Sequence, residues 1–224
     1  MSFPCTYAHA THLRTNVAAI AVCAMLAVLP GQLVAEGANK PDPFNAAVKA
    51  VKSENYSHAY DLFETLAQND NHDAQFNLAV LLKKGQGRPQ HFTKALEWAL
   101  LAQLGGVPQA NALRQDLSAL VTPNSYETCI ANVDAILKEK LAQGNRRTIL
   151  QYVVFNQTIV PEPDLETAYL WALIGAALGI PNADLLRDSM VEELDPDTIE
   201  SAQENARTLF EEQKMATLFS SSAG

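Results

Sequence analysis

The sequence predicts an all-helical protein of about ten helices, and three observations support this class. Alanine and leucine dominate the composition, and both lose little side-chain freedom in a helix. Apolar residues recur at helical spacing, as at Ala95, Trp98, Ala99 and Ala102. A long segment also repeats without gaps at an offset of 73 residues. Together these patterns indicate a chain of helices joined by short turns.

The repeat rests on residue types that restrict structure. Thirteen of the 45 positions from 95 to 139 are identical to positions 168 to 212. Gly106 is expected to end its helix in the left-handed conformation. Pro123 follows Thr122 as a proline in the first turn follows an N-cap. The structural positions that define the repeat are Ala95 with Ala168, Trp98 with Trp171, and Gly106 with Gly179. We interpret the tryptophans as core residues beside small alanines.

Extending this pattern in both directions predicts the order of helices. The expected domain covers residues 36–218, in units of about 43–71, 72–142 and 145–218, and a disordered tail at 219–224. The expected helices are 43–52, 56–69, 72–84, 92–104, 109–120, 123–142, 146–158, 165–178, 182–193 and 196–218.

The N-terminal 35 residues have the features of a secretory signal peptide. Arg14 precedes an unbroken apolar run from Val17 to Leu29, and a small residue, Ala35, follows. The run is shorter than a spanning helix requires. We therefore expect a periplasmic or secreted protein that is cleaved near Ala35 (Ala38 is the alternative) and does not insert in the membrane afterwards. Cys129 would be its one remaining cysteine, so no internal disulfide is expected.

The formal charge of −9 is concentrated in the C-terminal half. Residues 36–150 hold 12 basic and 12 acidic residues, whereas residues 151–224 hold 3 basic and 13 acidic ones. This balance argues against nucleic-acid binding. A basic partner is one interpretation of the acidic half, and a solvated surface that maintains solubility is the favoured one.

One segment resembles a Sel1-like repeat, a relative of the tetratricopeptide class. The pattern of that family is matched by Ala74, Leu78 and Ala79, then Lys84-Gly85-Gln86-Gly87, then Ala95, Trp98, Ala102 and Gly105. Arg88 and Pro89 depart from the family, which has an apolar residue after the loop. The loop 157–163 of the second unit lacks both glycines. The resemblance implies a right-handed α-solenoid of stacked antiparallel helix pairs and a role as an adaptor or scaffold.

The sequence contains no compact catalytic or phosphate-binding motif, so we predict no catalytic, cofactor-binding or metal-binding residues. The histidines at 58, 72 and 91 are interpreted as surface or capping residues, and Cys129 as a small core residue. The acidic run from Glu192 to Asp197 is interpreted as helix capping.

Two hypotheses for function follow. The first is an exported, non-catalytic adaptor that binds an unidentified protein partner on a surface lined by the first helix of each pair. The second is an exported enzyme or a cell-wall-glycan-binding protein. The candidate partner-binding residues of the first hypothesis are Asn77, Lys83, Lys84, Tyr152 and Asn156.

Overall fold

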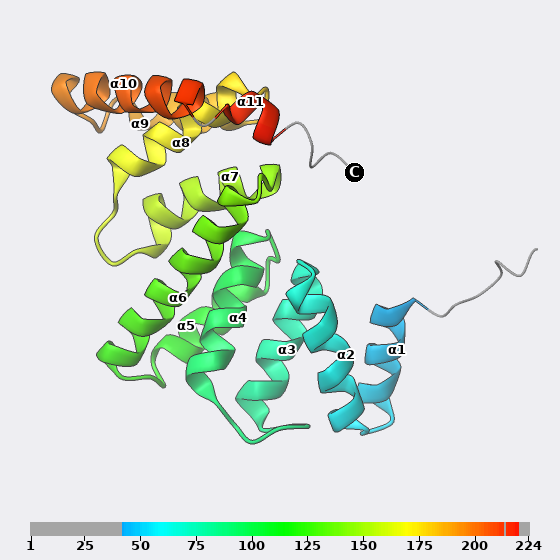
Figure 1. Ribbon diagram of the computed structural model, residues 1–224. Coiled ribbons are helices and arrows are strands. Elements are labelled where there is room, and N and C mark those ends of the chain that lie inside the picture. The colour runs from blue at the N-terminus through cyan, green and yellow to red at the C-terminus, as the bar shows by residue number, and fades with distance from the viewer. Residues whose placement is uncertain (1–41, 213, 220–224) are drawn as a thin grey trace, which may run out of the picture. The chain divides into compact units, whose positions relative to one another are not determined.

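A succession of helices joined by short turns makes up the part of the chain that the structure describes (Figure 1). The computed structural model describes residues 42–212 and 214–219, and these residues form helices with no strand among them. The all-helical prediction is confirmed. The elements are α1 (Pro43–Lys52), α2 (Tyr56–Gln68), α3 (His72–Lys84), α4 (Phe92–Leu104), α5 (Ala110–Ser118), α6 (Pro123–Ala142), α7 (Arg146–Val154), the π-helix η1 (Phe155–Ile159), α8 (Leu165–Ala177), α9 (Ala183–Met190), α10 (Pro196–Glu212) and α11 (Met215–Leu218).

Side-chain caps fix where several helices begin. Asn71 Oδ1 accepts a hydrogen bond from the Ala74 amide at 2.8 Å, and Asp164 Oδ1 accepts one from the Thr167 amide at 2.9 Å. Such caps satisfy backbone donors that have no partner within the helix. After α4, Gly106 adopts a φ of +84°, the left-handed conformation that the sequence predicts.

Equivalent helices begin at the offset found in the sequence. The starts of α4, α5 and α6 at Phe92, Ala110 and Pro123 are followed 73 residues later by those of α8, α9 and α10. The packing partners are also equivalent. Helix α4 contacts α3, α5 and α6, whereas α8 contacts α7, α9 and α10. The 73-residue repeat therefore applies to the positions of these helices as well as to the residues that are identical in the sequence.

The two tryptophans lie at the edge of the core rather than at its centre. Trp98 and Trp171 are both half-buried, in contrast to the fully buried alanines Ala95 and Ala168. The Lys94 ammonium lies 5.5 Å from the centre of the Trp98 ring. The largest side chains at the centre are phenylalanines, leucines and isoleucines. The prediction that tryptophan fills the core is thus corrected to partial burial.

Several expected helices are shorter than predicted by one to three residues at an end, such as 182–193, which is observed as Ala183–Met190. Three larger differences also occur. The helix expected at 146–158 is α7 followed by η1, and the one expected at 196–218 is divided into α10 and α11. Phe219, expected in a disordered tail, is fully buried in the core. An apolar aromatic side chain at the end of α11 explains this burial, since its removal from water is favourable. The predicted leader at 1–35 and residues 220–224 lie outside the described residues.

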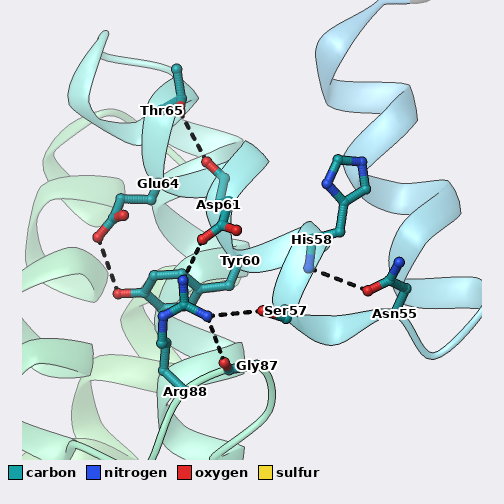
Figure 2. Close-up of polar contacts among 9 residues, drawn as sticks. All are labelled: Asn55, Ser57, His58, Tyr60, Asp61, Glu64, Thr65, Gly87 and Arg88. Atoms are coloured by element: carbon teal, nitrogen blue, oxygen red, sulfur yellow. Dashed lines mark hydrogen bonds and ion pairs between the residues drawn. The ribbon is translucent and has the colours of Figure 1, made fainter.

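Arg88, which departs from the family pattern, holds the loop after α3 against α2 (Figure 2). Its guanidinium donates to Ser57 Oγ at 3.0 Å and pairs with Asp61 Oδ1 at 2.5 Å. The guanidinium carbon lies 4.7 Å from the centre of the Tyr60 ring, within range of a cation–π interaction. The ion pair and the ring contact of Arg88 join the first two predicted units.

Candidate functional site

Helix α6 has two stripes of side chains, one in the core and one beside a hollow. Cys129, Val133, Leu137 and Leu141 recur every fourth residue and are buried. The second stripe consists of Glu127, Ile130, Ala131, Asp134 and Lys138, and it lines a hollow of about 420 Å³. Helical periodicity places these five residues on one face. One helix thus serves both the core and a concave surface.

The opposite wall of this hollow is the π-helix and the segment that follows it. The Val160 amide donates to the Phe155 carbonyl at 3.2 Å, which closes the wider π turn. Val160 then adopts an extended conformation, as expected of a residue that precedes proline, here Pro161. The Asp164 amide donates to the Asn156 carbonyl at 2.9 Å and holds the segment in place. Single π turns within helices occur often at functional sites.

A small polar network connects the two walls. The Tyr152 hydroxyl donates to Asp134 Oδ1 at 3.1 Å, and Lys138 Nζ donates to Asp134 Oδ2 at 2.7 Å. Burial, and secondly the charge of Asp134, raises the pKa of the Tyr152 phenol. The hydrogen bond with Asp134 raises the pKa of Lys138. At neutral pH the tyrosine therefore remains a donor and the lysine remains charged.

Aromatic packing fixes the position of Tyr152. Its ring stacks on Phe155 with centroids 6.1 Å apart and meets Trp171 edge-on at 5.9 Å. Phe155 is fully buried and Asn156 is 5% exposed. The Asn156 amide group donates to the Tyr152 carbonyl at 2.8 Å. The wall is consequently held by buried contacts.

A second hollow of about 360 Å³ adjoins the first along α6. The two share Glu127 and Pro161, and the second extends to Pro123 and Tyr126 at the start of the helix. We call the combined surface the α6 groove. From Pro123 to Lys138 the helix rises about 22 Å. An extended peptide of about six residues has a similar length.

Two further hollows lie elsewhere in the described residues. One of about 450 Å³ lies beside α1 and α2, and includes Lys49 and His58. The other, of about 260 Å³, lies between α8 and α10 and is mostly apolar, with Arg207 at its edge. Neither contains a nearly buried hydrogen-bonding side chain such as those of Tyr152 and Asn156 in the α6 groove.

The candidate partner-binding residues divide between two places. Tyr152 and Asn156 line the α6 groove. Lys83 instead pairs with Asp116 at 2.9 Å, Lys84 is exposed on α3, and Asn77 donates to the Asp73 carbonyl of its own helix at 2.8 Å. The structure therefore does not bring the candidates of α3 to the surface that holds those of α7 and η1.

The groove residues on α6 were not predicted from the sequence. Glu127, Asp134 and Lys138 recur at helical spacing beside the buried stripe, which is a signal for a second functional face. The loss of both loop glycines after α7, where Pro161 and Pro163 stand, marks the opposite wall. The π turn itself leaves no sequence pattern that periodicity detects.

Cys129, His72 and His91 occupy structural positions. Burial, with a smaller effect of the Glu97 carboxylate, raises the pKa of the Cys129 thiol to about 11. His91 caps α4 by accepting from the Lys94 amide at 3.2 Å, and His72 Nδ1 lies 2.9 Å from Gln75 Oε1. Within residues 42–212 and 214–219, no group of three or more potential ligands could hold a metal ion.

Within the acidic run before α10, Asp195 caps the start of that helix, in line with the interpretation of the run. Asp195 accepts hydrogen bonds from the Thr198 amide at 2.9 Å and from the Thr198 hydroxyl at 2.7 Å. These bonds lower the pKa of Asp195.

Comparisons with known proteins leave the family open. No family model matches this chain, and no match is found among curated proteins or solved structures. The Sel1-like resemblance therefore remains a prediction. Among the helices in the described ranges, none is both long enough and apolar enough to cross a membrane.

Proposed function

We propose that this protein is an exported, non-catalytic adaptor of the α-solenoid type, and that it binds a protein partner in the α6 groove. The observation that carries the proposal is the continuity of the groove along one face of α6, across two hollows that share Glu127 and Pro161. Stacked helical repeats commonly bind partners on concave surfaces of this kind. The leader expected at 1–35 would direct export.

The composition of the groove supports an extended peptide. Ile130 and Val160 provide apolar contact, and Tyr152 and Asn156 provide polar groups that are already oriented. Preorganised polar groups reduce the ordering cost of binding. The length of the groove along α6 suits a short segment in an extended conformation.

The alternative hypothesis of a glycan-binding protein receives less support. Its natural platforms would be the two tryptophans, but both are half-buried. Lys94 lies near the ring of Trp98, and Tyr152 meets that of Trp171 edge-on. A sugar needs an open aromatic face, which these contacts restrict.

Site-specific photo-crosslinking in the full-length protein tests this proposal. A benzophenone side chain at Ala131, exposed within the groove, is expected to form a saturable adduct with one protein in the host. The matched control places it at Glu139, exposed on α6 about 100° around the helix from Lys138. Equal adducts from both positions, or none from Ala131, would contradict the proposal.

A binding measurement with the identified partner completes the test. Ala131→Arg fills the groove and is expected to weaken binding at least about tenfold, whereas Lys84→Glu on α3 is expected to leave it unchanged. Loss of binding through Lys84→Glu alone would place the partner on the α3 surface instead.

A further inference from the structure

The α6 groove carries an excess of negative charge. Glu127, Asp134, Glu162 and Asp164 line its larger hollow together with one basic residue, Lys138. The hollow beside α1 and α2 has no carboxylate in its lining, and Arg207 at the hollow between α8 and α10 is paired with Glu204 at 2.6 Å. The negative excess is therefore a property of the α6 groove in particular.

Two of the four carboxylates have internal partners. Asp134 accepts from Tyr152 and Lys138, and Asp164 caps α8 through the Thr167 amide. Across the described residues, neither Glu127 nor Glu162 has a hydrogen-bond or ion-pair partner, and both side chains are exposed. Glu127 belongs to α6 and Glu162 to the facing segment, so an uncompensated carboxylate lies on each wall.

The lining of the hollow also has an apolar part. Ile130, Phe155 and Val160 contribute to the lining. An arginine or lysine side chain suits this arrangement, because its aliphatic part contacts apolar surface while its charged end reaches a carboxylate. Arginine suits it better, since its planar group pairs with carboxylates through two hydrogen bonds. An acidic or purely apolar segment would leave Glu127 and Glu162 without partners.

We infer that the occupant of the α6 groove is an extended peptide segment of a partner protein that carries arginine or lysine side chains, which pair with Glu127 and Glu162. This inference rests on the proposed function and specifies the chemistry of the partner. Of the two carboxylates, Glu162 belongs to the acidic C-terminal half and Glu127 to the preceding part of the chain, so the inference applies the basic-partner interpretation to one defined surface only.

Synthetic peptides test the charge preference directly. Hexapeptides of alternating leucine and arginine, leucine and serine, and leucine and glutamate are titrated into the full-length protein at low ionic strength, and the dissociation constants are measured by fluorescence polarisation. The arginine peptide is expected to bind about tenfold more tightly than the serine peptide, and the glutamate peptide most weakly.

Paired substitutions locate the effect. Glu127→Gln with Glu162→Gln is expected to weaken binding of the arginine peptide about fivefold and to leave the serine peptide unchanged. The matched control, Glu139→Gln with Glu193→Gln, makes the same charge change at exposed positions outside the groove. Equal weakening by both pairs would mean a general electrostatic attraction and would overturn the inference.

The outcomes separate this inference from the proposed function. If the arginine peptide binds no better than the serine peptide while Ala131 still crosslinks a partner, the groove is a binding site and the basic occupant is wrong. If Ala131 crosslinks no partner, the proposed function fails, whichever peptide binds.

Discussion

In the two units α3–α6 and α7–α10 the last three helices start at the same offset, but the first helices end differently. Helix α3 ends at Gly85 in the left-handed conformation, and the loop that follows is held on α2 by Arg88. Helix α7 instead passes into a π turn and then into a segment with two prolines, which forms one wall of the α6 groove. Equivalent helices thus give a closed loop in one unit and a concave surface in the other.

This difference indicates which parts of the repeat are free to change. The alanines that match across the offset, such as Ala95 with Ala168 and Ala110 with Ala183, lie where helices pack closely and are fully buried. The connections that follow α3 and α7 differ in sequence and conformation, because loops tolerate changes of length and composition. A binding surface arises here through a change in one connection while the helix framework is retained.

The largest expected effect concerns the closed loop of the first unit. Gly87 has a φ of +80°, and a Cβ atom there would lie 2.3 Å from the Tyr56 carbonyl oxygen. Gly87→Ala is therefore expected to destabilise the protein by about 3 kcal/mol or more, because the obstacle is backbone. Gly106, with a φ of +84° and nothing within 4 Å of the added atom, is the matched control.

Gly106→Ala is expected to cost about 1 kcal/mol, from conformational strain alone. Urea denaturation followed by far-UV circular dichroism measures both variants. Equal losses of stability would show that the loop after α3 moves away from α2 at little cost. The loop after α3 would then not be a closed loop, and its contrast with the segment after α7 would disappear.

The framework was more predictable from the sequence than the groove. Helix starts followed from local signals, such as Thr122 before Pro123, and the left-handed Gly106 followed from its place at a helix end. The groove depends on a tertiary contact between Asp134 and Tyr152, which periodicity does not report. The π turn at Phe155 is set by the wider bond from Val160, and no residue type marks it.

The tryptophans illustrate the same limit. Trp98 and Trp171 follow the core rhythm of their helices, yet both are half-buried, because a large ring seldom fits entirely between closely packed alanine-rich helices. Helical periodicity predicts which face of a helix carries a side chain, but not how deeply that side chain is buried.

A second comparison uses these two residues. Trp171 contacts both buried clusters and the Tyr152 ring, whereas Trp98 contacts one cluster. Trp171→Ala is expected to cost about 3 kcal/mol and Trp98→Ala about 2 kcal/mol, since partial burial reduces the loss below that of a fully buried ring. Urea denaturation monitored by circular dichroism measures the difference, and a larger loss from Trp98→Ala would reverse the predicted order.

The smallest effect concerns Cys129, whose equivalent in the second unit is the buried Ala202. At neutral pH the Cys129 thiol is protonated in the folded and in the unfolded chain. Cys129→Ala is then expected to lower the free energy of unfolding by about 1 kcal/mol through lost packing. In the unfolded chain a cysteine ionises near pH 8.5. Because burial raises the folded pKa to about 11, the unfolded state binds fewer protons between these values. Stability of the wild type therefore falls as pH rises through this window.

The free energy of unfolding of the wild type and of Cys129→Ala is measured from pH 7 to pH 10. The difference isolates the contribution of the Cys129 thiol, since every other titrating group is common to the two proteins. A background of Cys5→Ser and Cys23→Ser leaves Cys129 as the one thiol of the chain. The stability advantage of the wild type over Cys129→Ala is expected to be constant up to about pH 8 and to shrink above it. An advantage that stays constant to pH 10 would mean that the folded thiol ionises as readily as the unfolded one, and that Cys129 is not shielded as its alanine counterpart in α10 is.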